Sequence, residues 1–386
     1  MSERDLLMIP GPINFDPGVL RAMSAPTTSH VAPEFIARFG ETLEWMKQVF
    51  GAPNGTPFVI AGSGTLAMDI AASNLTERGD HAIVISTGYF GDRMANILQR
   101  YGAQVTVLRA EVGDVIPLDQ IDAELARVKP KILTMTHVDT STGVAVDVRT
   151  IAQIGRKHNA LVIVDGVCSV GGMELQQQAW DVDVAFTASQ KAIGVPPGLA
   201  LLVASPRAIA AFEKRTSPVG SYYSDWSNWL PVMQAYIARK PAYFGTPAVN
   251  LIYALHESLR QILAEGMAQR VARHKKLSDA FKAGIHAIGL KQVAVRDEIA
   301  ATTMTAPYFP EGVDTQLISK IRERGIVVAG GLHPAIREKY FRVGHMGVIS
   351  PADISATLSA IEGALLASGF KFEVGAALAA AEKLMV

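Results

Sequence analysis

Short β-branched runs alternate with amphipathic stretches from residue 57 to residue 205, and this alternation restricts the possible fold more than any other feature. It is typical of a mainly parallel sheet with helices on both faces. Seven strands are expected, at 58–61, 82–86, 104–108, 131–136, 161–165, 182–187 and 199–203. Helical spacing lies between them at 64–76, 89–101 and 147–158. Ligands of such sheets bind where the carboxyl ends of the strands meet the loops, so functional residues are expected there.

The length of 386 residues predicts a large domain with a smaller partner. We expect an N-terminal arm at 1–18, a large domain at 19–288 and a small α+β domain at 289–386. Residues 248–288 are charged and periodic, as a long helix leaving the large domain would be, whereas 289–300 has no strong pattern. In the small domain we expect strands at 301–308, 327–329 and 340–343, and helices at 313–325 and 351–368.

Charge and cysteine content favour a small-molecule ligand over a macromolecular one. Lys plus Arg and Asp plus Glu both number 36, so no net field attracts nucleic acid or an anionic membrane. Cys168 is the only cysteine, which excludes an internal disulfide. The first apolar run follows two acids and is cut by Pro10, so it does not resemble a signal peptide. We expect a soluble, cytoplasmic protein without a metal site.

A glycine-rich turn follows the first strand. Residues 61–65 read Ala-Gly-Ser-Gly-Thr and open a helix, so their amides and hydroxyls can cradle a phosphate. With Ala67 the segment also fits the loose dinucleotide pattern Gly-x-Gly-x-x-Ala, which makes an NAD-dependent dehydrogenase a rival. That rival needs an acid at the end of the next strand, but the strand ends in Ser86-Thr87-Gly88. A turn that serves packing alone remains a third interpretation.

An acid and a lysine follow two later strands. Asp165 ends an apolar strand, and Lys191 lies between another strand and the uncharged segment Ala-Ile-Gly-Val-Pro-Pro-Gly. Most lysines are solvated, but a desolvated lysine has a lowered pKa and forms an imine with an aldehyde. Pyridoxal 5′-phosphate (PLP) carries such an aldehyde and needs a carboxylate against its pyridinium nitrogen. Asp165 can supply that carboxylate, although a capping or turn role is the alternative.

Three further residues end strands or begin helices near the same edge. The fork of Arg342, among glycines, suits an α-carboxylate, with a structural ion pair as the alternative. Phe90 can stack on an aromatic ring, although core packing is the commoner role. Thr140 is expected to donate a hydroxyl, whereas His137 is expected to be a packed neighbour rather than a metal ligand. The aromatic-rich segment 218–247 predicts either a subunit interface or an active-site wall.

Several motifs together resemble the alanine:glyoxylate and serine:pyruvate aminotransferases, which belong to class V of the PLP-dependent aminotransferases. They are Pro10-Gly-Pro12, Ala61-Gly-Ser-Gly-Thr65, Thr136-His-Val-Asp-Thr-Ser-Thr-Gly143, Val164-Asp165, Ser189-Gln-Lys191, Tyr243-Phe-Gly-Thr-Pro247, 328–332 and Arg342-Val-Gly-His345. The likeness runs in order from residue 7 to about 368 and is nearest to the fungal enzymes around Thr140, Gln190 and 326–348. Animal members differ at Thr65 and Phe90, where they carry His and Trp.

The resemblance implies the aspartate-aminotransferase fold (fold type I) and a homodimer with active sites shared between subunits. It implies that Lys191 carries the cofactor as a Schiff base and that Asp165 pairs with the pyridine ring. For the remaining positions it implies phosphate binding by Ser63, Gly64, Thr65 and Gln190, phosphate binding across the dimer by Tyr243 and Thr246, ring contacts by Phe90 and Thr140, and substrate carboxylate binding by Gly11 and Arg342.

The activity expected from this resemblance is amino transfer from alanine to glyoxylate, which yields glycine and a 2-oxo acid. Serine:glyoxylate or serine:pyruvate transfer is the alternative. A PLP lyase of the cysteine desulfurase type would need a nucleophilic cysteine, but Cys168 follows Asp165 closely and resembles a packed residue. The dehydrogenase and a non-enzymatic binding module are the alternatives from other classes.

Overall fold

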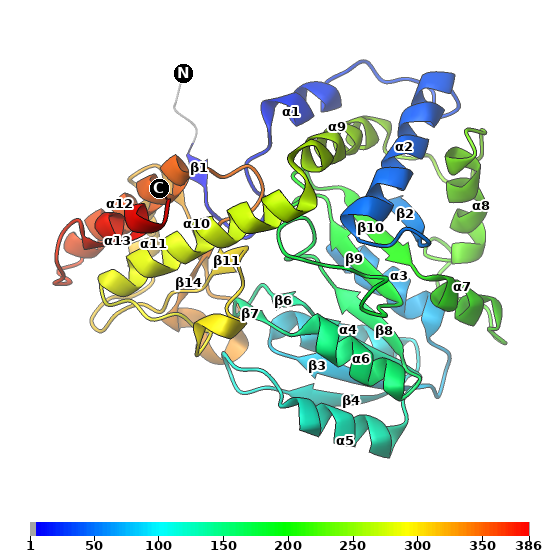
Figure 1. Ribbon diagram of the computed structural model, residues 1–386, viewed down its shortest axis with the longest axis horizontal. Helices are drawn as coiled ribbons and strands as arrows, with labels where there is room; N and C mark the ends of the chain where they lie inside the picture. Colours follow the sequence, from blue (N-terminus) through cyan, green and yellow to red (C-terminus); the bar gives the residue numbers. More distant parts are fainter. Residues whose placement is uncertain (1–4, 386) are drawn as a thin grey trace.

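The computed structural model describes residues 5–385 and contains a seven-stranded sheet with the order β2-β10-β9-β8-β5-β3-β4 (Figure 1). Its strands are β2 (Thr56–Ala61), β3 (His81–Ser86), β4 (Gln104–Arg109), β5 (Ile132–Thr136), β8 (Leu161–Asp165), β9 (Val184–Ala188) and β10 (Leu199–Ala204). Strand β10 runs antiparallel to both of its neighbours, and the other pairs are parallel. All seven expected strands join this sheet, so the predicted mainly parallel α/β architecture is confirmed.

Helices cover the sheet and explain the apolar strand sequences. Helix α3 (Gly64–Leu75) packs on β9 and β10, α4 (Tyr89–Arg100) on β3 and β4, and α6 (Val148–Lys157) on β8. Every residue of β5, β8, β9 and β10 is buried, as expected of strands that are covered on both faces. Further helices of this part are α1 (Pro17–Met23), α2 (Pro33–Val49), α5 (Leu118–Val128), α7 (Pro206–Glu213) and α8 (Trp226–Ile237).

The prediction of a single long helix at 248–288 is wrong in the middle of that segment. Two helices, α9 (Val249–Glu265) and α10 (Met267–Ala287), meet at Gly266, whose φ is +84°. A residue in this left-handed region ends a helix, and glycine adopts the conformation without a side-chain clash. From this break α10 crosses to the side of the molecule that holds the C-terminal helices (Figure 1).

The C-terminal part has its own hydrophobic cluster. Its three-stranded sheet has the order β11 (Met304–Thr305), β14 (Phe341–Gly344), β13 (Ala329–Gly330), and its helices are α11 (Gln316–Arg322), α12 (Pro351–Leu366) and α13 (Ala376–Met385). Short strands β12 (Ile326–Val327) and β1 (Leu6–Leu7) pair in parallel. The cluster also includes Met8 and Phe281, which come from before the expected boundary at residue 289.

That boundary stays a prediction. Of the expected N-terminal arm, residues 1–4 lie outside the described residues. Within residues 5–385, no helix has both the length and the apolar character needed to cross a membrane.

Candidate active site

A cavity of about 190 Å³ opens at the carboxyl ends of the parallel strands. It gathers most of the residues singled out from the sequence. Its lining comprises Gly11, Ser63, Gly64, Thr65, Met68, Phe90, Arg93, Thr136, Val138, Thr140, Asp165, Val167, Gln190 and Lys191. Segments from six regions of the chain therefore meet at the edge where ligands of parallel sheets bind.

Lys191 enters this cavity from the loop after β9 and is only 8 % exposed. Burial lowers the pKa of its ammonium group, and the charge of Arg342 acts in the same direction, whereas the carboxylate of Asp165 opposes them. The Nζ donates a hydrogen bond to the carbonyl of Pro10. The neighbouring Gly11 lies against the same side chain, since a Cβ there would stand 2.7 Å from the Lys191 Cδ. The amine is therefore desolvated and held in place by the N-terminal segment.

Asp165 ends the neighbouring strand β8 and is 3 % exposed. Burial raises the pKa of its carboxyl to about 7, and the charge of Asp139 adds to the rise. A hydrogen bond from the Val167 amide to Oδ1, at 2.9 Å, and the charges of Lys191 and Arg93 act in the opposite direction. A cationic ring nitrogen placed here would favour the ionised carboxylate.

The glycine-rich turn precedes α3 as expected. Ser63 occupies the position before the helix without capping it through its side chain, so its hydroxyl is not engaged there. A Cβ on Gly64 would lie 3.1 Å from Val167, so the turn packs closely against the loop after β8. Gln190 lines the cavity, and its buried Oε1 has no hydrogen-bond partner among the described residues. The free amides and the Ser63 hydroxyl can donate hydrogen bonds to a phosphate, and so can the Gln190 Nε2, whereas the Gln190 Oε1 can only accept.

Phe90 lies in the first turn of α4 and lines the same cavity. The guanidinium of Arg93 lies over its ring at 4.8 Å and donates a hydrogen bond of 3.0 Å to Thr65 Oγ1. Sequence reasoning missed Arg93. The spacing of Phe90 and Arg93 could have predicted its place, because residues three positions apart on the expected helix lie on the same face.

Thr140 also lines the cavity, whereas His137 does not. Burial lowers the pKa of the His137 imidazole to about 4, which keeps the ring neutral at physiological pH. No group of three His, Cys, Asp or Glu side chains that could bind a metal ion is found within residues 5–385.

Three expected site residues do not line this cavity. Arg342 lies behind Thr140, donating 3.2 Å from Nη1 to the Thr140 carbonyl and 2.8 Å from Nε to the Gly330 carbonyl. Its position next to a lining residue keeps it close to the cavity. Tyr243 is 65 % exposed, and neither it nor Thr246 is brought to the cavity of its own chain.

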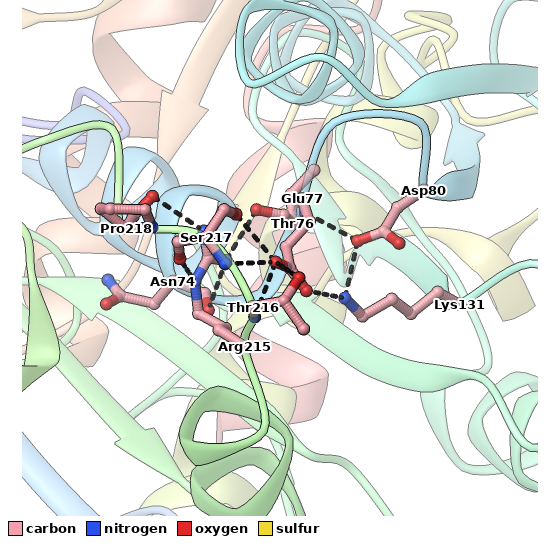
Figure 2. A network of polar contacts seen from close by, with 9 residues as sticks. All are labelled: Asn74, Thr76, Glu77, Asp80, Lys131, Arg215, Thr216, Ser217 and Pro218. Carbon is pink, nitrogen blue, oxygen red and sulfur yellow. Dashed lines mark hydrogen bonds and ion pairs between the residues drawn. The ribbon is translucent and has the colours of Figure 1, made fainter.

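A polar network fixes the start of the segment that carries Tyr243 and Thr246 (Figure 2). Glu77 Oε1 accepts hydrogen bonds from the backbone amides and hydroxyls of Thr216 and Ser217, and these bonds lower the pKa of its carboxyl to about 2. Arg215 donates to the carbonyls of Asn74 and Thr76. Because Asn74 belongs to α3, the network joins the helix that begins at the glycine-rich turn to the aromatic segment 218–247.

Comparison with known proteins identifies the family of this chain. The sequence profile of the family described as Aminotransferase class-V matches residues 20–352. Alanine–glyoxylate aminotransferase 1 of Saccharomyces cerevisiae is 40% identical over 358 residues, covering 89% of this chain and 92% of that protein. L-aspartate–glyoxylate aminotransferase of Paracoccus denitrificans is 32% identical, covering 99% and 96%. The crystal structure of ureidoglycine–glyoxylate aminotransferase from Bacillus subtilis has a TM-score of 0.93 at 31% identity, covering 100% and 98%.

Proposed function

This chain belongs to the class V aminotransferases, and we propose that it transfers the amino group of alanine to glyoxylate, giving pyruvate and glycine. The chain is a PLP-dependent transaminase, and its relatives support glyoxylate transamination in general. The choice of alanine as donor and the roles of individual residues are the proposal.

One observation carries the proposal: a buried lysine and a buried aspartate line one cavity together with a glycine-rich turn at a helix N-terminus. A lysine with a lowered pKa can capture an aldehyde. The turn offers amides to a phosphate. The carboxylate can balance a ring cation. Gln190 lines the same cavity and can donate from its Nε2 to a phosphate.

When bound, PLP withdraws electrons from the α-carbon of an amino acid. Lys191 would hold the cofactor and, once released by the incoming amino acid, would remove the α-proton and deliver it again as general base and acid. Asp165 would keep the pyridine nitrogen protonated, and Phe90 would lie against the ring. Ser63, Gly64, Thr65 and Gln190 would hold the phosphate, and Thr140 would contact the ring substituents.

Arg342 and Gly11 would bind the carboxylate that donor and acceptor share. Arg342 donates two hydrogen bonds, to the carbonyls of Gly330 and Thr140, and these bonds fix the orientation of its guanidinium. A fixed fork loses little conformational freedom when it binds a carboxylate. Because both substrates carry this group, one site serves both half-reactions.

A donor-by-acceptor panel tests the substrate assignment. We expect kcat/KM to be highest for alanine with glyoxylate, with serine as the second donor. Serine with glyoxylate or with pyruvate as the preferred pair would favour the alternative function. Preference for aspartate, the donor named for the Paracoccus relative, would contradict the assignment of alanine.

A lyase of the desulfurase type is less well supported. Cys168 is 1 % exposed and does not line the cavity. Such a lyase needs a cysteine that reaches its substrate. Retention of full activity in Cys168→Ala would agree with transamination, whereas its loss together with a trapped persulfide would favour the lyase.

A cytoplasmic homodimer with shared active sites is also part of the proposal. Tyr222 and Tyr243 are 80 % and 65 % exposed, which is unusual for large aromatic side chains. Tyr243 and Thr246 would reach the phosphate bound by a second copy of the chain. Light scattering tests the dimer. Mixing inactive Lys191→Ala with a weakened Tyr243→Ala variant tests sharing, since mixed dimers would regain one intact site.

A further inference from the structure

Asp139 is a fully buried carboxylate that lies one residue before Thr140 and does not itself line the cavity. It ends the short strand β6 (Val138–Asp139), which pairs with β7 (Val144–Ala145) to form a tight turn. Each of its two oxygens accepts two hydrogen bonds. Such complete satisfaction allows a carboxylate to stay buried.

One oxygen holds the start of α4. Asp139 Oδ2 accepts from the amide of Phe90 at 2.9 Å and from the amide of Gly91 at 3.3 Å. Gly88, at the cap of α4, makes no side-chain capping bond, so the carboxylate of Asp139 caps the helix from a distant segment. A Cβ on Gly88 would stand 2.7 Å from the Asp139 Cγ, and glycine at this position therefore permits the close contact.

The other oxygen holds the turn itself. Asp139 Oδ1 accepts from the Ser141 amide at 2.9 Å and from the Ser141 hydroxyl at 2.6 Å. The same hydroxyl oxygen accepts from the amide of Tyr89 at 3.0 Å. Asp139 and Ser141 together bind the three amides that open α4, so the position of Phe90 depends on this turn.

The far side of the turn contacts the strand that carries Arg342. The Thr140 carbonyl accepts from Arg342 Nη1, and the Ser141 carbonyl accepts from the hydroxyl of Tyr340. The turn therefore contacts both the residue proposed to stack on the cofactor ring and the residue proposed to bind the substrate carboxylate.

We propose that Asp139 is a positioning residue of this active site, whose carboxylate fixes Phe90 against the cofactor ring and Thr140 beside it. The inference rests on the proposed function, since it assumes that PLP occupies the cavity. A role confined to stability is the competing explanation, because any buried carboxylate with four hydrogen bonds stabilises its surroundings. The charge of Asp139 also raises the pKa of Asp165, which is consistent with an action on the site.

Asp183 provides a matched control. It is 3 % exposed, against 0 % for Asp139, and accepts hydrogen bonds from the Val162 amide, the Ser205 hydroxyl and the Arg207 guanidinium. It does not line the cavity. Asp139→Asn and Asp183→Asn each replace one buried acceptor oxygen by an amide, so both are expected to lower the melting temperature.

The test measures PLP affinity and the visible circular dichroism of the bound cofactor in the full-length protein. We expect Asp139→Asn to weaken PLP binding about tenfold and to reduce the visible dichroism, while Asp183→Asn changes both by less than about twofold. Equal effects of the two variants on these signals would overturn the proposal.

A double-mutant cycle with Phe90→Leu identifies the route of the effect. If Asp139 acts through Phe90, the loss of affinity in Asp139→Asn should be smaller in the Phe90→Leu background. Full additivity of the two losses contradicts positioning. Should Asp139→Asn fail to fold, Ser141→Ala removes the hydroxyl bond to Asp139 and the bond from the Tyr89 amide, and it keeps the Asp139 side chain. A weaker loss in the same direction supports the proposal, and unchanged binding and dichroism overturn it.

Failure of the proposed function can be distinguished from failure of the proposal for Asp139. If the wild-type protein binds PLP but does not convert alanine and glyoxylate, the substrate assignment fails while the affinity and dichroism comparisons still test Asp139. If the wild-type protein binds no PLP, both proposals fall.

Discussion

Lys191 and Asp165 line one cavity from the ends of neighbouring strands. Burial lowers the pKa of Lys191 and raises the pKa of Asp165, so it favours the neutral form of both groups. Solvated groups of these types would both be charged at neutral pH. PLP bound in the cavity would suit both groups. Its protonated ring nitrogen would pair with the Asp165 carboxylate, and its aldehyde would react with the neutral amine of Lys191. Lys191 and Asp165 together therefore suit a ligand that carries a positively charged group.

The first prediction concerns Asp165→Asn and pH in the cofactor-free protein. The carboxyl pKa is about 7 in the folded chain, against 3.8 for an ordinary solvated aspartate. Between these values the folded protein holds a proton that the unfolded chain has released, so this group stabilises the fold at low pH, and the contribution is lost as pH rises through 7. The free energy of unfolding of wild type minus that of Asp165→Asn should fall across this window. Saturating PLP should abolish the fall, and a flat difference in the cofactor-free protein would contradict the raised pKa.

The second prediction concerns Gly11→Ala. Its φ is +107°, and a Cβ would lie 2.7 Å from Lys191 Cδ and 3.2 Å from the Gln190 carbonyl oxygen. We expect a loss of about 1–3 kcal/mol in stability and at least about a tenfold loss in kcat/KM, since Lys191 must move. Gly312→Ala is the control, because Gly312 has φ +79° with nothing within 4 Å. It should show only the backbone cost of about 1–2 kcal/mol and keep full activity.

The third prediction concerns Arg93→Met. Arg93 is the cation that contacts Thr65 of the glycine-rich turn, and it lies over Phe90. Its removal should weaken PLP binding about tenfold, which corresponds to about 1.4 kcal/mol. Arg100→Met, at an exposed position on the same helix, controls for the general loss of positive charge. Equal affinities of the two variants would show that Arg93 does not contribute to phosphate binding.

The fourth prediction concerns the network of Figure 2. Hydrogen bonds from Ser217 and Thr216 keep Glu77 ionised and lower its pKa to about 2, against 4.5 for an ordinary solvated glutamate. This contribution to stability is present above pH 4.5 and is lost as pH falls through 2. Glu77→Gln should therefore lower the melting temperature at neutral pH and have little effect near pH 2. Glu124→Gln breaks an exposed pair with Arg127 and should have a smaller effect at neutral pH.

The sheet was predictable because its central strands β5, β8, β9 and β10 are short, largely apolar segments bounded by turns, as burial on both faces requires. The short strands of the C-terminal part were placed less well, since two residues such as those of β12 or β13 carry no periodicity. The break at Gly266 shows the same limit, because one glycine inside a periodic segment does not reveal its φ.

The position of Asp165 and Lys191 at the cavity was predictable, because each residue follows a strand of the parallel sheet. Asp139 was not found from the sequence, because its hydrogen bonds join the 139–143 turn to a helix that begins about fifty residues earlier in the chain. Tyr243 and Thr246 stay predictions, since their proposed role requires a second copy of the chain.

The most direct test is chemical reduction of the PLP-loaded protein with borohydride, followed by peptide mapping. Reduction fixes the cofactor to whichever lysine holds it. We predict a single phosphopyridoxyl group on the peptide that contains Lys191, and a Lys191→Ala variant without visible absorption or turnover. A label on any other lysine, or an undiminished steady-state rate in Lys191→Ala, would contradict the assignment.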